Sequence, residues 1–248
     1  VRASRDGPQG TRSVVEDIRV DSQEECPLYF GFSIRQIAVG PSPGWLRRAL
    51  EAVGLRSVNN VVDVTNYVLM EMGQPLHAVD ADKIRGSQLM IRQARSGETI
   101  VTLDERKREL AHHMTVIADE ERPLVIAGIM GSLDAEVDDS TCNIFLEAAY
   151  FRSRFIRRTS RYLGLSTDSS YRFERGIDPR NVEYAALRAI DLILEVAGGK
   201  VSGPAFVVGT HPLETREISL DPAFVRSRLG FGPDNRTIET ALGSLELD

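Results

Sequence analysis

Apolar side chains recur at helical spacing in four segments of this chain, and each segment runs into a glycine. Apolar positions three and four residues apart are typical of helices that pack one face onto a core. A glycine just past the last turn is a common helix end. The pattern predicts helices over residues 43–53, 60–72, 152–163 and 179–197. In the last helix the candidates for burial include Leu187, Ile190, Ile193 and Leu194.

The first predicted helix has a clear start signal. Ser42 precedes Pro43, so we expect the serine side chain to cap the free amides while proline takes the first helical position. The side chains expected to face inward are Trp45, Leu46, Leu50 and Val53.

The second predicted helix starts at Asn60 and ends at Gly73, with Pro75 just beyond. Asp63, three residues after Asn60, is expected to complete a capping box. The β-branched residues of its apolar stripe leave a strand as the alternative. That stripe consists of Val61, Val64, Val68 and Met72.

Shorter apolar runs lie between and around these helices and predict strands. They are Tyr29–Ile34, Leu89–Ala94, Thr99–Leu103, Thr115–Ala118, Leu124–Ile129 and Asn143–Ala148. Helices mixed with several short strands predict an α+β fold, a layered mixed α/β domain.

The chain divides into three stretches by composition. Residues 1–25 are polar and lack periodicity, which predicts a linker or a weak edge element. Residues 26–205 hold the elements named so far. After a break rich in glycine and proline, residues 213–248 predict the truncated start of a small helical domain. There we expect a strand at Ile218–Leu220, a helix from Asp221-Pro222 to Gly230, and another helix over Thr237–Leu245.

Composition narrows the class of protein. A net charge of −6 argues against a generally basic surface for nucleic acid, although a local basic face is compatible with it. No apolar run is long enough to cross a membrane, and the first ten residues lack an apolar signal core, so we expect a cytoplasmic protein. Cys26 and Cys142 lie far apart with no metal-ligand pattern, which favours free thiols and no metal site.

Two runs concentrate polar and special residues, although no phosphate loop, dinucleotide fingerprint, HExxH or GxSxG motif is present. The run VVDVTNYVLMEMGQPLHAVD, residues 61–80, has a tight turn that presents His77. That histidine either serves chemistry or hydrogen-bonds the backbone of the turn. The second run, residues 145–179, includes FLEAAYF and LSTDSSYRFERGIDP. Its Glu147 faces water or points inward, and an inward carboxylate needs a partner such as a ligand hydroxyl.

These runs, together with AGIMGS and the spacing among them, resemble the central region of the bacterial phenylalanyl-tRNA synthetase beta subunit. The resemblance covers roughly residues 26–199, and the tail from Ile218 is similar to the start of the family's next module, a small DNA-binding-like domain. It implies an editing domain over residues 26–205 that hydrolyses mischarged Tyr-tRNA(Phe). It also implies two alpha and two beta subunits, with ATP and Mg²⁺ used by the whole synthetase and no cofactor in this region.

The resemblance also assigns residues. The family's editing histidine falls on His77, the asparagine of its TNY motif on Asn66, and the glutamate that recognises the tyrosine hydroxyl on Glu147. Further pocket-lining positions fall on Gly131, Thr167 and Ser169. The chain departs from the family pattern at Ser132 (often glycine), Ser169 (usually alanine) and Val79 (often phenylalanine). Ser169 adds a hydroxyl to the expected pocket wall.

A basic helix face is the candidate for tRNA contact. Its residues are Arg154, Arg157, Arg158 and Arg161, at spacings of three and four. The alternative is a solvated face paired with acids such as Glu174.

The implied reaction is hydrolysis of an aminoacyl ester by a positioned water. His77 or Asn66 would orient the water or the ester, and backbone amides near Gly131 would polarise the carbonyl. A competing hypothesis is a non-catalytic tRNA-docking and subunit-assembly module with a vestigial pocket. Ser132 and Ser169 favour that alternative, whereas the presence of both His77 and Glu147 counts against it.

Overall fold

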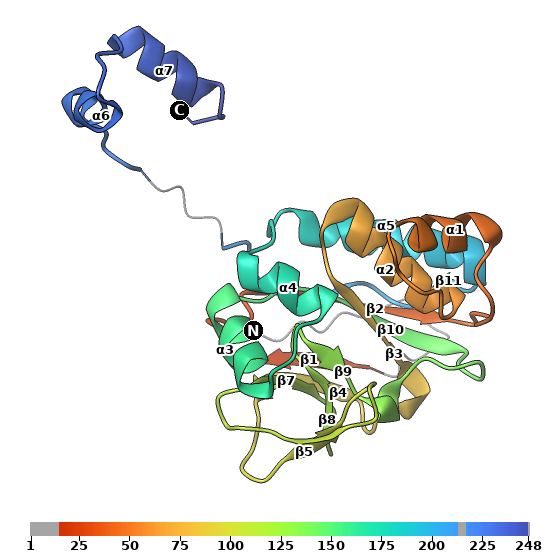
Figure 1. The fold of residues 1–248 in the computed structure, drawn as a ribbon. Helices are drawn as coiled ribbons and strands as arrows, with labels where there is room; N and C mark the ends of the chain where they lie inside the picture. The colour runs from red at the N-terminus through yellow and green to blue at the C-terminus, as the bar shows by residue number, and fades with distance from the viewer. Residues whose placement is uncertain (1–14, 213–216, 248) are drawn as a thin grey trace. The chain divides into compact units, whose positions relative to one another are not determined.

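The computed structural model describes residues 15–212 and 217–247, and the chain divides into two units between Pro212 and Leu213 (Figure 1). The first unit combines two sheets with a layer of helices, which confirms the predicted α+β class.

The first sheet has the strand order β1-β4-β7-β8-β9. Its strands are β1 (Asp17–Val20), β4 (Gln88–Gln93), β7 (Thr115–Ala118), β8 (Pro123–Ile126) and β9 (Met130–Gly131). Strand β1 pairs in parallel with β4, and the other neighbours are antiparallel. The stretch expected to be a linker or weak edge element therefore contributes an edge strand, and Ile18 of that strand is buried. Strands β5 (Thr99–Val101) and β6 (Lys107–Glu109) form a separate pair.

The second sheet has the order β11-β2-β10-β3, and β12 also pairs with β2. Its strands are β2 (Leu28–Arg35), β3 (Leu76–Asp80), β10 (Asn143–Tyr150), β11 (Lys200–Val201) and β12 (Phe206–Gly209). All of these pairs are antiparallel. Strands β2 and β10 are buried along almost their whole length, because both faces of this sheet are covered.

Helices cover one face of the second sheet and the first sheet covers the other, so the second sheet is the middle of three layers (Figure 1). The covering helices are α1 (Gly44–Ala52), α2 (Asn60–Met72) and α5 (Asn181–Ala197). Helices α3 (Ser153–Leu163) and α4 (Asp168–Arg175) pack on each other, and Ile156 and Phe173 join them to the core between the sheets. Two short 3₁₀ helices are η1 (Ala81–Lys83) and η2 (Leu133–Ala135).

The predicted details of the first helix are partly wrong. Leu46 and Leu50 are buried as expected, but Trp45 is 37% exposed and Val53 is 55% exposed. Ser42 makes no cap; its hydroxyl instead donates to Oδ2 of Asp63 at 2.6 Å. A hydrogen bond to a carboxylate is stronger than one between neutral groups, so the Ser42 hydroxyl bonds Asp63 instead of capping the helix.

The second predicted element is a helix, so the strand alternative is wrong. Its cap is Asn59, whose side chain accepts from the amides of Val61 and Val62. Asp63 forms no capping box, because its carboxylate is buried against Ser42, Ser57 and Val58. In α5, Ile190 and Ile193 are buried, but Leu187 is 46% exposed.

The described part of the second unit holds two helices, α6 (Pro222–Leu229) and α7 (Asn235–Gly243). Asp221 caps α6, and Gly230 ends it in the left-handed conformation, as expected from the sequence. Ile218–Leu220 is irregular rather than the expected strand. Neither helix buries a residue, and Phe224 is 53% exposed.

Candidate functional site

Glu147 and His77 are direct neighbours across two strands. In the central strand β10, Glu147 pairs with His77 of β3 on one side and with Gly31 of β2 on the other. Side chains of directly paired residues project to the same face of a sheet. The fold therefore brings the two predicted residues together from distant parts of the chain.

The face that carries this pair is the one covered by the first sheet. Along β10, Phe145 and Ala149 belong to the core between the sheets, whereas Leu146 and Ala148 belong to the core beneath the helices. Since strand side chains alternate, Glu147 shares the face of Phe145. Of the two orientations left open by the sequence, the inward one is observed.

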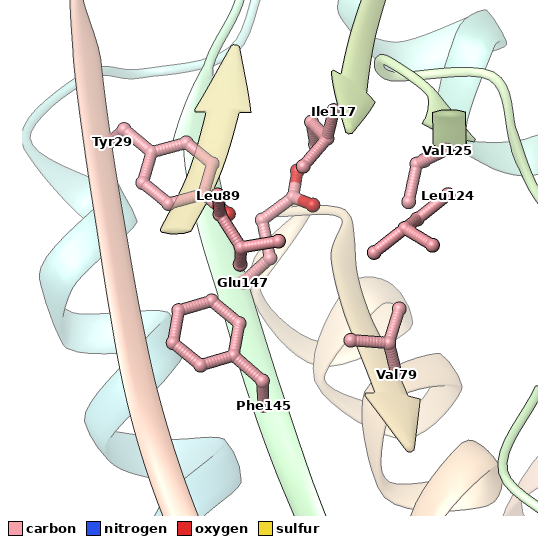
Figure 2. A pocket seen from close by; sticks show the side chains of 8 residues that line it. All are labelled: Tyr29, Val79, Leu89, Ile117, Leu124, Val125, Phe145 and Glu147. Carbon is pink, nitrogen blue, oxygen red and sulfur yellow. The ribbon is translucent and has the colours of Figure 1, made fainter. Parts of the chain in front are cut away.

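A small cavity lies at the carboxyl group of Glu147 (Figure 2). Its volume is about 10 Å³, about what one water molecule needs. The second sheet and the first sheet both contribute to the wall. The lining residues are Tyr29, Val79, Leu89, Ile117, Leu124, Val125, Phe145 and Glu147.

Glu147 is held in an apolar environment without compensation. Its side chain is 8% exposed, and among the described residues no hydrogen bond or ion pair reaches its carboxyl group. Burial raises the pKa of Glu147 to about 8, because desolvation penalises the charged form. The carboxyl group is therefore protonated at neutral pH and offers one donor and free acceptor sites.

His77 is shifted in the opposite direction. Burial lowers the pKa of His77 to about 4, so its imidazole is neutral at pH 7. It lies within strand β3 rather than in the turn before it. No hydrogen bond of its ring is found in the described ranges, so backbone bonding of a turn histidine does not describe it.

The AGIMGS run places its two glycines where a side chain cannot fit. A Cβ atom at position 131 would lie 2.6 Å from both Cε1 and Nε2 of His77, so Gly131 is packed against the imidazole edge. Gly128 has φ +67, and a Cβ there would lie 2.9 Å from Ile156 and 3.0 Å from Phe173. Gly128 thus allows α3 and α4 to pack closely, and Gly131 leaves room for the His77 ring.

Ser132, which follows Gly131, is 3% exposed, and its hydroxyl has no hydrogen-bond partner within residues 15–212. Its backbone amide donates to the carbonyl of Leu124 at 2.7 Å. Val79, the other departure on this side, lines the cavity itself.

Thr167 and Ser169 lie at the start of α4. Thr167 caps the helix by accepting from the amide of Ser170, and its hydroxyl donates to the carbonyl of Ile129 at 2.9 Å. Thr167 thereby ties α4 to the turn that leads into β9 and Gly131. Ser169 is partly buried, and neither residue lines the cavity at Glu147.

Asn66 is partly buried on α2, and its amide makes no hydrogen bond within the described part of the chain. It shares a helix face with Met70, one turn later, whose sulfur lies 3.1 Å from Nη2 of Arg172 on α4. The structure records no contact that joins Asn66 to His77.

The four arginines of α3 are all exposed. Arg154 pairs with Glu24, and Arg157 donates to the backbone carbonyl of Glu174 rather than to its carboxylate. Arg158 and Arg161 make no ion pair with any described residue. Two of the four arginines on this face are therefore bound to other parts of the protein, and two are not.

Two further residues at this site, Tyr29 and Gly31, were not selected from the sequence. Tyr29 lines the cavity and is 1% exposed. Gly31, the other neighbour of Glu147, leaves room for the ring of Phe145, which a Cβ at position 31 would overlap. A tyrosine within an otherwise apolar predicted strand was the available sequence signal.

Within the described residues, no group of three or more His, Cys, Asp and Glu side chains could hold a metal ion. Cys26 and Cys142 are free thiols, as the sequence favours. No helix in these ranges is long and apolar enough to cross a membrane.

Comparison with known proteins supports the resemblance. A family model described as "B3/4 domain" matches residues 25–198. The chain is 42% identical over 238 residues to the phenylalanine–tRNA ligase beta subunit of Carboxydothermus hydrogenoformans, which covers 96% of this chain and 30% of that protein. It is 50% identical over 199 residues to the corresponding subunit of Geobacter sulfurreducens, which covers 80% of this chain and 25% of that protein. The chain thus spans less than a third of the relatives' length.

A solved structure shares the fold. It is an N-terminal fragment of the phenylalanyl-tRNA synthetase beta subunit from Pyrococcus horikoshii, with a TM-score of 0.51 and 12% identity, and the match covers 95% of this chain and 65% of that one. Together with the family model, these matches confirm the family expected from the sequence. The chain belongs to the B3/4 domain family and is similar, along nearly its whole length, to part of the beta subunit of phenylalanine–tRNA ligase.

Proposed function

We propose that this chain is the editing part of a phenylalanine–tRNA ligase and hydrolyses the ester that joins tyrosine to tRNA(Phe). The observation that carries the proposal is the buried Glu147 carboxyl group, which has no protein partner among the described residues. It lies beside His77, which in turn packs against Gly131, and the family resemblance assigns both of these residues to the site.

Selection follows from the unpaired carboxyl group. A synthetic site that accepts phenylalanine cannot strongly reject tyrosine, which only adds a hydroxyl. A second site can select in the opposite direction if it has a polar group that only tyrosine satisfies. Leaving a buried polar group unpaired costs about 1–3 kcal/mol, which gives roughly tenfold to hundredfold discrimination. The correctly charged tRNA is therefore spared.

The chemistry needs a positioned water molecule rather than a covalent intermediate. The neutral His77 imidazole can accept a proton from water or orient the ester, and its low pKa makes it a weak base. The Ser132 amide is already bonded to Leu124, so it cannot polarise the ester carbonyl. The Asn66 amide is uncommitted and serves as a second orienting group, and a ribose hydroxyl of the tRNA can assist.

The same proposal supplies the partners. The relatives' name, phenylalanine–tRNA ligase beta subunit, implies an alpha subunit, and ATP and Mg²⁺ would serve aminoacylation in the whole synthetase. The tRNA(Phe) would reach the pocket across α3. Its main contacts there would be Arg158 and Arg161, which are exposed and unpaired among the described residues. Arg154 and Arg157 would contribute less, because both already bind other parts of the protein.

Deacylation of Tyr-tRNA(Phe) and Phe-tRNA(Phe) by the assembled synthetase tests the proposal. We expect rapid loss of tyrosine but not of phenylalanine, and a reduction of at least tenfold in Glu147→Ala and in His77→Ala. Glu183→Ala, an exposed glutamate on α5, is the matched control and should be unchanged. A wild-type rate equal to the uncatalysed rate would remove the proposal.

The alternative is a docking and assembly module with a vestigial pocket. One observation favours it. The cavity has room for one oxygen atom but not for an aromatic ring, so substrate binding requires the lining side chains to move. This alternative predicts no deacylation by wild type but weaker aminoacylation when Arg158 and Arg161 are replaced.

A further inference from the structure

Tyr29 is the second polar group at the Glu147 cavity. It lies on β2, two residues before Gly31, which is the strand partner of Glu147, so its side chain projects to the same face. The residue is 1% exposed. Figure 2 shows its hydroxyl directed toward the Glu147 carboxyl group from the neighbouring strand.

Neither polar group is satisfied by the protein. In the described part of the chain no hydrogen bond reaches the Tyr29 hydroxyl or the Glu147 carboxyl group. The remaining lining side chains are Val79, Leu89, Ile117, Leu124, Val125 and Phe145, which offer no polar atom. Both side chains line the same cavity, so a single small polar group placed there would lie next to both of them.

Other buried hydroxyls in this unit do find partners. The Thr115 hydroxyl donates to Glu25 at 2.8 Å, and the Thr141 hydroxyl donates to Asp80 at 2.7 Å. The fold can therefore satisfy a hydroxyl beside a carboxylate. The Tyr29 hydroxyl and the Glu147 carboxyl group have no such partner among the described residues, and both side chains line the same cavity.

The size of the cavity matches one oxygen atom. Its volume of about 10 Å³ suits a single hydroxyl or water. A phenolic oxygen carries one hydrogen to donate and lone pairs that accept. Burial and the adjacent Glu147 raise the pKa of Tyr29 well above its usual value, so the Tyr29 hydroxyl keeps its hydrogen and can donate it.

We propose that Tyr29 is a specificity-determining residue that holds the substrate's phenolic oxygen together with Glu147. The substrate hydroxyl donates to a carboxyl oxygen of Glu147, and the Tyr29 hydroxyl donates to the substrate oxygen. No proton is transferred and no bond is broken in this step. The inference rests on the proposed editing function and adds a requirement: the ligand group must accept a hydrogen bond as well as donate one.

The test compares two aminoacyl groups in the assembled synthetase. Tyrosine on tRNA(Phe) both donates and accepts at the para position, whereas para-aminophenylalanine donates but its ring-conjugated nitrogen is a poor acceptor. We expect Tyr29→Phe to lower kcat/KM for deacylation of Tyr-tRNA(Phe) about tenfold, the effect of one hydrogen bond. For the para-amino substrate we expect less than a twofold change.

Tyr150→Phe is the matched control, because Tyr150 lies on β10 but belongs to the core beneath the helices. It should deacylate both substrates as wild type does. An equal loss on both substrates in Tyr29→Phe, or no loss on either, would overturn the role of Tyr29 while the editing proposal stands. A wild type that fails to deacylate Tyr-tRNA(Phe) would remove the editing proposal and this inference together.

Discussion

Two buried acids in the first unit are treated in opposite ways by the fold. Asp63, between α1 and α2, is fully buried and accepts hydrogen bonds from the Ser42 hydroxyl, the Ser57 hydroxyl and the Val58 amide. Glu147, between the two sheets, is almost as buried and has no partner in the described residues. Asp63, which joins structural elements, has its hydrogen-bonding capacity filled by the protein, whereas Glu147, which is assigned to the pocket, does not.

The difference in hydrogen bonding distinguishes a structural carboxyl group from a candidate for function without reference to relatives. Saturated buried acids stabilise the loops that donate to them. An unsaturated one lowers stability in the absence of a ligand, so its presence points to a ligand.

The largest expected effect is loss of stability in Asp63→Ala. It leaves two hydroxyls and one amide without their acceptor, and hydrogen bonds to charged groups contribute about 1.5–3 kcal/mol each. We expect the free energy of unfolding to fall by about 4 kcal/mol, since such contributions are not fully additive. Urea unfolding followed by fluorescence of Trp45, the single tryptophan, measures it.

Asp191→Ala, an exposed acid on α5, is the control for Asp63 and should change stability by less than about 0.5 kcal/mol. A loss below about 1 kcal/mol in Asp63→Ala would mean that a full set of hydrogen bonds does not identify an acid that stabilises this fold.

The second effect is a gain of stability in Glu147→Gln. The pKa of Glu147 is about 8 in the folded chain and near 4.5 when unfolded, so the folded state binds more protons between these values and wild-type stability falls as pH rises. The variant lacks this loss. We expect it to exceed wild type by about 3 kcal/mol at pH 7 and by almost nothing at pH 4.

The same urea experiment at a series of pH values measures this difference. His77 titrates identically in both proteins, so subtraction removes its contribution. A difference between the variant and wild type that does not depend on pH would contradict the unpaired state of Glu147.

The third effect sharpens the pocket side of the comparison. Gly131→Ala places a Cβ 2.6 Å from the His77 ring, which must shift to relieve the overlap. Misplacing a reacting group by about 1 Å can cost on the order of a hundredfold in rate. We expect Tyr-tRNA(Phe) deacylation to fall between tenfold and a hundredfold. Gly40→Ala, where an added Cβ meets nothing within 4 Å, should retain the wild-type rate.

The smallest effect concerns exposed charges, for which pairing matters least. Replacing Arg158 and Arg161 with Gln should raise KM for tRNA about threefold and reduce the salt dependence of binding by about one unit of slope per lost phosphate contact. Arg188→Gln, an exposed arginine already paired with Glu71, is the comparison variant. An unchanged salt slope in the double variant would exclude this face from tRNA contact.

Local signals predicted most of the fold. The glycines after α2 and α3 end those helices in the left-handed conformation, and apolar runs marked the central strands β2 and β10. The errors occurred where tertiary contacts override local preference. Ser42 is a good cap in isolation, but Asp63 binds it from the next helix. Ile218–Leu220 has strand-forming residues but, in the described range, no strand to pair with.

The sequence selected candidate site residues but did not predict how they are arranged. His77 and Glu147 were singled out from their surroundings and from the family resemblance, yet their contact depends on the register of β3 against β10, which no local pattern specifies. Tyr29 was missed for the same reason. The position of Tyr29 near Glu147 depends on β2 lying beside β10, and the sequence shows only a tyrosine in an apolar strand.

The middle position of β10 has a consequence for how the protein forms during synthesis. Strands β2 and β3 leave the ribosome well before β10, yet each pairs with β10 rather than with the other. During synthesis β2 and β3 therefore remain unpaired with β10 until it has been made, and their apolar faces are accessible to chaperones or to other chains in that interval. Slow codons that delay β10 would lengthen this exposed interval, and aggregation would then increase with no change in the finished protein.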